Sequence, residues 1–154
     1  MSYRLYSYWR SSSAWRVRIG LALKGLPYEY VAVNLLEGEQ FSDAHQARSP
    51  LAQVPVLEVE ERGHVLRLAQ SMAILEWLDE RHPTPPLLPR DLDRRAEVRA
   101  LAEHVNSGIQ PLQNAAPLKM LREKEAGYDK VWARHWIARG LTGLERAAAA
   151  TAGR

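Results

Sequence analysis

The 154-residue sequence contains no cysteine. This absence excludes a disulfide framework, a cysteine zinc site and a cysteine nucleophile, and it is compatible with the reducing cytosol. No apolar run approaches the roughly 18–20 residues that span a bilayer. The segment from Met1 to Arg10 also lacks the apolar core of a signal peptide. We therefore expect a soluble, cytoplasmic protein that does not partner with a membrane.

Clusters of one charge are also missing. The net charge is +3 and the pI is about 9.4, yet residues 1–82 carry 9 basic and 10 acidic side chains. Residues 83–154 carry 12 basic and 8 acidic side chains. In this part arginines alternate with acidic residues, as in Asp91, Asp93, Arg94 and Glu97. Such alternation is typical of a solvated helix face, whereas nucleic-acid binders gather their basic residues in a patch. We therefore predict no nucleic-acid partner.

The five histidines show no spacing of metal ligands. We interpret them as surface or helix-end residues and predict no metal site. The apolar fraction of 46% and the charged fraction of 25% are those of an ordinary globular protein.

The first third of the chain alternates strand and helix signals. Residues 3–9 are aromatic and alternating, which favours a strand. Three serines at 11–13 supply helix caps, and Gly25 and Pro27 end the helix that follows. Its apolar residues at helical spacing predict one buried face, made of Trp15, Ile19, Ala22, Leu23 and Leu26. A second β-rich run at 28–34 completes a βαβ unit, which normally forms a parallel strand pair.

A hairpin and another helix follow. Residues 55–59 and 65–69 read as strands joined by a turn at 61–64. Ser71 then caps a helix with apolar residues at 72, 75 and 78. The order βαβ followed by ββα predicts an α/β, thioredoxin-like domain over residues 1–82.

Four prolines between positions 83 and 90 exclude a helix there. We predict a linker at 83–91 and a helical domain at 92–154. The expected helices run from 92 to about 106, from 109 to about 124, and from 128 to about 150. Trp132 and Trp136 lie at helical spacing in the last of these, which favours a core or interface role.

Two junctions between a strand and a helix, and the start of one strand, carry residues that suit chemistry. Ser11 to Ser13 either cap a helix or donate to a thiolate, which must then arrive with a cosubstrate because the chain has no thiol. Gln70–Ser71 offers a helix N-terminus that suits a carboxylate, or Ser71 is only a cap. Val54–Pro55 is either an ordinary edge-strand proline or a cis bond that turns the Val54 backbone toward a peptide-like ligand.

Residues 11–19, Ser-Ser-Ser-Ala-Trp-Arg-Val-Arg-Ile, resemble the Ser-Ser-Cys-x-x-Arg-x-Arg-Ile/Val signature of zeta-class glutathione transferases, the maleylacetoacetate isomerases. The resemblance extends over essentially the whole chain. It includes Gln53-Val54-Pro55, Gln70-Ser71 and the class-specific segment Gly-Ile-Gln-Pro-Leu-Gln-Asn at 108–114. It implies a thioredoxin-like domain followed by a helical glutathione-transferase domain. Members of this family continue past the Thr-Ala-Gly of residues 151–153, so we expect the second domain to be incomplete.

The resemblance implies roles for particular residues in binding glutathione. Ser11 matches the hydroxyl that activates the glutathione sulfur, with Ser12 beside it, and Ser13 replaces the signature cysteine. Val54 matches the residue that pairs with the cysteinyl backbone of glutathione. The remaining binding residues are implied to be Gln40 at the glycyl end, Gln70 and Ser71 at the γ-glutamyl end, and Gln110 and Asn114 from the helical domain.

The resemblance further implies a reaction. Maleylacetoacetate would isomerise to fumarylacetoacetate by addition, rotation and elimination of glutathione, and the enzyme would be a homodimer. Arg16 matches the signature arginine, as a structural or acidic-substrate contact, and Arg10 and Arg16 are candidates to neutralise the acidic substrate. The alternatives are a maleylpyruvate isomerase, a non-catalytic glutathione-binding module, and an inactive truncated form.

Overall fold

A computed structural model describes residues 1–152 of the chain. The chain forms two compact units, Met1–Leu87 and the residues from Leu88 onward. No helix among residues 1–152 is both long and apolar enough to cross a membrane.

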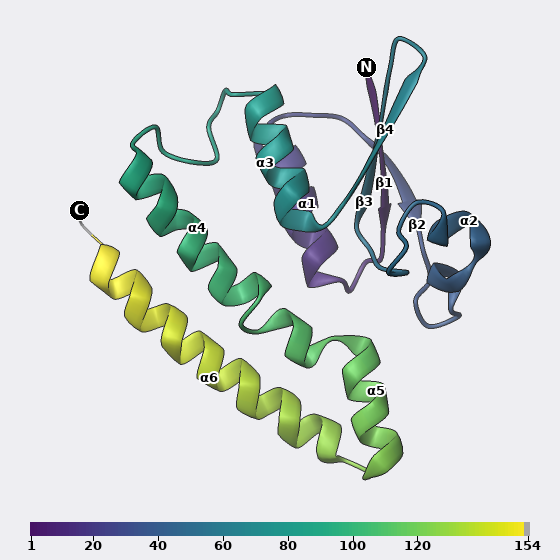
Figure 1. The fold of residues 1–154 in the computed structure, drawn as a ribbon, viewed down its shortest axis with the longest axis vertical. Helices are drawn as coiled ribbons and strands as arrows, with labels where there is room; N and C mark the ends of the chain where they lie inside the picture. Colours follow the sequence, from purple (N-terminus) through teal and green to yellow (C-terminus); the bar gives the residue numbers. More distant parts are fainter. Residues whose placement is uncertain (153–154) are drawn as a thin grey trace. The chain divides into compact units, whose positions relative to one another are not determined.

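The first unit is a four-stranded sheet with helices on both faces (Figure 1). Its elements in chain order are β1 (Ser2–Ser7), α1 (Ser12–Leu23), β2 (Glu29–Ala32), the 3-10 helix η1 (Glu39–Phe41), α2 (Asp43–Gln46), β3 (Val56–Glu61), β4 (His64–Ala69) and α3 (Ser71–Arg81). The strand order is β2-β1-β3-β4, with β1 parallel to β2 and antiparallel to β3. This is the thioredoxin-like arrangement, so the fold predicted from the order of elements is confirmed.

The main core lies between the sheet and the helices α1 and α3, which lie side by side on one face (Figure 1). Leu5 and Leu57 from the sheet meet Val17 and Leu21 from α1 and Ile74 from α3, and all five side chains are fully buried. Burying an aliphatic side chain stabilises a fold by about 1.5–3 kcal/mol, so this cluster holds the helices on the sheet.

The predicted buried face of α1 is wrong. Trp15, Ile19 and Leu23 are 58%, 49% and 58% exposed, while Ala14 and Val17 are fully buried. The helix carries apolar residues on nearly every side, so helical spacing alone does not say which side meets the sheet. One histidine also differs from the prediction, because His45 is buried beside the Tyr6 ring and its Nε2 atom lies 3.0 Å from the Gln53 carbonyl oxygen.

The second unit is all helical. It contains α4 (Leu92–Asn106), the 3-10 helix η2 (Gln110–Gln113), α5 (Ala115–Lys124) and α6 (Tyr128–Thr151), and α4 runs alongside α6 in the opposite direction (Figure 1). Ile109 is the only buried apolar side chain among the described residues of this unit. It packs directly on Gly140, where an added Cβ would lie 2.3 Å from the Ile109 Cγ1 atom. The Trp132 indole donates a 2.7 Å hydrogen bond to the Leu112 carbonyl.

The segment 82–87 is fastened to the first unit by a buried lysine. The Lys24 side chain is fully buried, and its Nζ donates to Asp79 at 2.6 Å, to the His82 carbonyl at 2.6 Å and to the Pro85 carbonyl at 2.5 Å. Asp79 also accepts the Leu87 backbone N–H at 2.7 Å. A buried ammonium needs such partners, because an unpaired one carries a large desolvation cost.

Replacing Lys24 with Met should lower the free energy of unfolding by about 3–5 kcal/mol, because it leaves the Asp79 carboxylate buried without its cation. Urea denaturation measures the loss, and Lys24→Met combined with Asp79→Leu should recover part of it. Lys119→Met is the matched control, since Lys119 is 77% exposed and its ion pair with Glu123 is solvated. Equal stabilities for the two single variants would contradict the role given to Lys24.

A second ionic group lies on the opposite face of the sheet from α1 and α3. Glu58 on β3 is buried and accepts hydrogen bonds from Arg4 at 2.7 Å and Arg67 at 2.9 Å. Burial by itself would raise the pKa of Glu58, but the hydrogen bonds from Arg67 and Arg4 outweigh it, so the pKa lies below its ordinary value.

Glu58 should therefore stabilise the protein only when it is ionised. Glu58→Gln should lower the free energy of unfolding by about 1–2 kcal/mol at pH 7. The folded-state pKa is depressed, so this contribution is present above the ordinary pKa of 4.5 and is lost as the pH falls through the lower folded value. Denaturation curves at pH 7 and pH 3 test this, with Glu60→Gln, at an exposed residue of the same strand, as control. A difference between Glu58→Gln and wild type that persists undiminished at pH 3 would contradict it.

Candidate functional site

The sheet topology brings the predicted site residues of the first unit to one edge. Tyr6 near the end of β1 pairs with Val56 at the start of β3, and Val56 pairs with Ala69 at the end of β4. Ser7 pairs with Ala32 at the end of β2. The segments that follow β1, β2 and β4 and the segment that precedes β3 therefore emerge at the same end. These segments contain Ser11–Ser13, Gln40, Gln70–Ser71 and Val54.

Ser11 is the N-cap of α1. Its Oγ accepts a 3.1 Å hydrogen bond from the Ala14 backbone N–H, and its carbonyl accepts from the Trp15 N–H at 2.8 Å. Because the cap uses a lone pair of the hydroxyl oxygen, its proton is available to donate to an anion. Ser12 and Ser13 occupy the first turn, where backbone N–H groups have no acceptor within the helix. The capping role of Ser11 is thus confirmed, and donation from this helix end to a thiolate stays a prediction.

Ser71 begins α3 and is almost completely buried at 2% exposure. Its Oγ accepts a 2.7 Å hydrogen bond from Nη1 of Arg16 on α1. This bond joins the N-terminal halves of two helices whose sequences are 55 residues apart. The structure therefore places the guanidinium of Arg16 on the serine predicted to bind the γ-glutamyl end.

Gln70, the N-cap of α3, has an unusual backbone conformation with φ 71° and ψ 112°. A non-glycine residue at positive φ costs roughly 1–2 kcal/mol, and such residues concentrate at binding sites. Gln70 makes no side-chain capping bond, and its side chain is exposed at the site edge. This conformation is consistent with the predicted role of Gln70 in binding, which stays a prediction.

Three buried polar atoms at or after the ends of β1 and β2 have no hydrogen-bond partner among residues 1–152. They are Ser7 Oγ, Tyr8 Oη and Gln40 Oε1. Buried polar groups in proteins are nearly always hydrogen-bonded, so unsatisfied ones indicate a place for a ligand or water. Gln40 lies in η1, after β2. An amide can present its oxygen or its NH₂ group, which suits a peptide-like ligand with both donors and acceptors.

Val54 is half-buried, and the Val54–Pro55 peptide bond is cis, as the resemblance implies. The Thr84–Pro85 peptide bond is cis as well. Arg10 is exposed, and its guanidinium carbon lies 5.6 Å from the centroid of the Trp9 ring. Trp9 is itself 70% exposed beside the serine cluster.

Two predicted site residues belong to the second unit. Gln110 begins η2 and is half-buried, and Asn114 is the N-cap of α5, where its side-chain oxygen accepts from the Ala115 N–H at 3.0 Å. Their contact with the cosubstrate stays a prediction. The segment around them also has a structural role, since Ile109 and Leu112 make the contacts with α6 described above.

The comparisons with known proteins agree with this geometry. Residues 1–80 match the family model of the glutathione S-transferase N-terminal domain. A solved structure of maleylacetoacetate isomerase from Anaeromyxobacter dehalogenans, with glutathione in its active site, is 70% identical, has a TM-score of 0.90, and is matched over 99% of this chain and 71% of that one. The chain belongs to the zeta class of the glutathione S-transferases.

Two further relatives set the limits of the match. A probable maleylacetoacetate isomerase of Drosophila melanogaster is 44% identical over 152 residues, which are 97% of this chain and 64% of that protein. A bacterial zeta-class maleylpyruvate isomerase structure is 42% identical with a TM-score of 0.88, over 98% of this chain and 71% of that one. This glutathione S-transferase chain thus spans about two thirds of the length of the relatives it matches.

The residues of the first unit fit glutathione. Ser11 has an O–H that can donate to a sulfur anion, and Ser71 has one at a helix N-terminus that can donate to a carboxylate. Gln40 has a buried amide oxygen with no hydrogen-bond partner among residues 1–152. The position of the class's signature cysteine is occupied by the half-buried Ser13. A serine keeps a hydroxyl donor there but removes the oxidation chemistry of a thiol.

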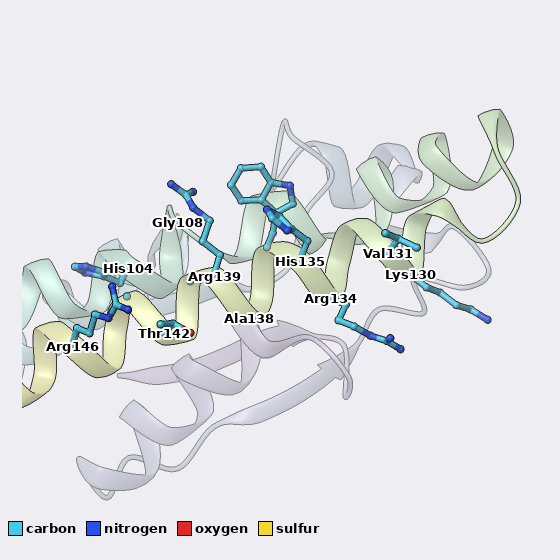
Figure 2. A pocket seen from close by; sticks show the side chains of 13 residues that line it. His104, Gly108, Lys130, Val131, Arg134, His135, Ala138, Arg139, Thr142 and Arg146 are labelled. Carbon is cyan, nitrogen blue, oxygen red and sulfur yellow. The ribbon is translucent and has the colours of Figure 1, made fainter.

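One groove on the surface is lined by residues of the second unit. It has a volume of about 970 Å³, runs along α6 and is also lined by His104 in α4 and by Gly108 just after that helix (Figure 2). Its charged lining is basic, with Lys130, Arg134, Arg139 and Arg146. No predicted site residue lines it. The helix caps, strand ends and unsatisfied polar atoms are therefore the better guide.

Gln70→Gly should raise the stability of the protein while weakening its binding of glutathione. Glycine adopts positive φ without strain, so the free energy of unfolding should rise by about 0.5–1 kcal/mol, while the loss of the side chain weakens glutathione binding. Thermal denaturation and calorimetric titration measure the two effects. Gln53→Gly, at an exposed residue without positive φ, should only destabilise. If Gln70→Gly is no more stable than the wild type, the backbone at Gln70 is not strained as argued.

Proposed function

We propose that this protein is a glutathione-dependent cis–trans isomerase that converts maleylacetoacetate to fumarylacetoacetate, a step of tyrosine and phenylalanine breakdown. The observation that carries the proposal is the match at 70% identity to a maleylacetoacetate isomerase with glutathione bound. In support, the first-unit residues that match the family's glutathione contacts lie in segments that emerge at one edge of the sheet.

When bound, glutathione supplies a thiolate that adds reversibly to the conjugated double bond, so that the bond can rotate before the thiol leaves. The chain has to keep that sulfur ionised. The Ser11 hydroxyl and the N-terminus of α1 favour a thiolate, since a hydrogen bond to the charged form and the helix dipole both lower a thiol's pKa. Ser12 and Ser13 extend this donor set along the first turn.

The substrate is acidic, so the site must also supply positive charge. Arg10 follows β1 directly, is exposed, and adjoins Ser11 in sequence. Its contact with the Trp9 ring restricts where its guanidinium can lie. We assign Arg10 to the carboxylates of the substrate, where a guanidinium can pair with two oxygens at once.

Maleylpyruvate is the second candidate substrate, favoured by the match to a maleylpyruvate isomerase at 42% identity. Both substrates are conjugated dicarboxylates and need the same chemistry. We expect the active form to be a homodimer in which Gln110 and Asn114 approach the cosubstrate.

The proposal predicts glutathione-dependent isomerisation of maleylacetoacetate by the purified chain. Ser11→Ala should lower kcat about tenfold to a hundredfold, because a hydrogen bond to the sulfur anion is lost. Ser2→Ala, at the exposed start of β1, is the matched control and should retain full activity. Maleylpyruvate is assayed in parallel, and the higher kcat/KM identifies the substrate.

Three other outcomes would contradict the proposal. Glutathione binding without turnover of either substrate would indicate a binding module. Neither binding nor turnover would indicate an inactive form. Undiminished activity of Ser11→Ala would remove Ser11 from the mechanism.

A further inference from the structure

The hydrogen bond from Arg16 to Ser71 connects the two helix ends of the site. Arg16 lies on α1, five residues after the cap Ser11, and Ser71 is the first residue of α3. The donor is the Arg16 Nη1 atom and the acceptor is the Ser71 Oγ atom, 2.7 Å apart. The distance is at the short end for N–H···O bonds, as expected for a charged donor.

This bond determines what the Ser71 hydroxyl can do. A serine oxygen has two lone pairs and one proton. The guanidinium occupies one lone pair, so the proton has to point away from Arg16. The Ser71 hydroxyl is therefore oriented as a donor, and the charge behind it makes it a stronger one.

Arg16 also adds a positive charge beside the N-terminus of α3, where the glutathione carboxylate is expected to bind. The N-terminus of α3 carries the positive end of a helix dipole. A carboxylate oxygen that accepts from Ser71 would lie about 4–6 Å from the guanidinium nitrogen, since two successive hydrogen bonds of about 2.7–2.8 Å separate them. At that distance, and with Ser71 only 2% exposed, the attraction is weakly screened.

We propose that Arg16 is a positioning residue for the γ-glutamyl carboxylate of glutathione, acting through Ser71, and that it does not serve the acidic substrate. The two arginines of the site then have separate tasks. Arg16 orients a donor toward the cosubstrate, while Arg10, exposed beside Trp9, faces the second substrate. This inference rests on the proposed glutathione-dependent function and specifies which end of glutathione Arg16 controls.

The test compares two ligands. Glutathione and γ-aminobutyryl-cysteinyl-glycine, which lacks only the α-carboxylate of the glutamyl residue, are titrated calorimetrically against wild type, Arg16→Met and Arg16→Lys. Arg16→Met should raise the Kd of glutathione about tenfold to a hundredfold, the range for a hydrogen bond that serves a charged group. The Kd of the analogue should change less than about threefold. Arg16→Lys keeps a cationic donor and should restore most of the affinity for glutathione.

Two further measurements separate positioning from general support of the fold. In a Ser71→Ala background, Arg16→Met should cause no additional loss of glutathione affinity, because the Ser71 hydroxyl through which Arg16 acts is already absent. In steady-state kinetics, Arg16→Met should raise the KM of glutathione and leave the KM of the dicarboxylate and kcat at saturating glutathione unchanged. Arg18→Met, two residues along the same helix, is the control and should leave both Kd values unchanged.

The outcomes that overturn the inference are distinct from those that overturn the function. Equal losses for glutathione and the analogue, or a raised KM for the dicarboxylate alone, would overturn the role of Arg16 and leave the isomerase intact. If the wild type binds glutathione and Arg16→Met binds it with the same Kd, the role of Arg16 is likewise overturned and the isomerase reading is untouched. A wild-type chain that binds no glutathione would overturn both.

Discussion

The pairing of β1 with strands on both sides is the constraint on which the first unit depends. β1 is parallel to β2 and antiparallel to β3, so the ends of β1, β2 and β4 and the start of β3 meet at one edge. Helices begin directly after β1 and β4, and their N-termini therefore open at that edge too. A site for a ligand with a sulfur anion and a carboxylate follows from this topology, because two helix ends present donors to negative charge.

Charge is used differently in the two units. In the first unit, arginines and a lysine are tied into named pairs: Arg4 and Arg67 with Glu58, Arg81 with Glu61, and Lys24 with Asp79. The Glu58 pairs join neighbouring strands, Arg81–Glu61 joins α3 to β3, and Lys24–Asp79 lies beside the segment 82–87. Arg16 is joined to Ser71 in the candidate site. In the second unit, Arg122 pairs with the buried Asp129, which lowers the pKa of that carboxyl through the hydrogen bond. The cations along α6 line an open groove instead.

Most of the elements were predictable from the sequence because their signals are local. Serines at 11–13 and at 71, the glycine and proline after α1, and the four prolines at 83–90 each act through neighbouring backbone, so they mark the ends of helices without any knowledge of the fold. The helix over 92–106 was predicted with its bounds as they are. One helix was predicted from 109 to about 124, but the segment divides into η2 and α5 because Asn114 caps a new helix.

The sequence by itself determined the order of strands and helices, the absence of any thiol in the chain, and, through its motifs, the residues offered to glutathione. The tertiary structure decided which face of α1 is buried and that His45 is buried. It also decided that Lys24 hydrogen-bonds the segment 82–87 and that Arg16 donates to Ser71. The physical reason is the same in each case. A cap or a breaker acts over a few residues, whereas these contacts join positions up to 61 residues apart and exist only once strand pairing and register have brought them together.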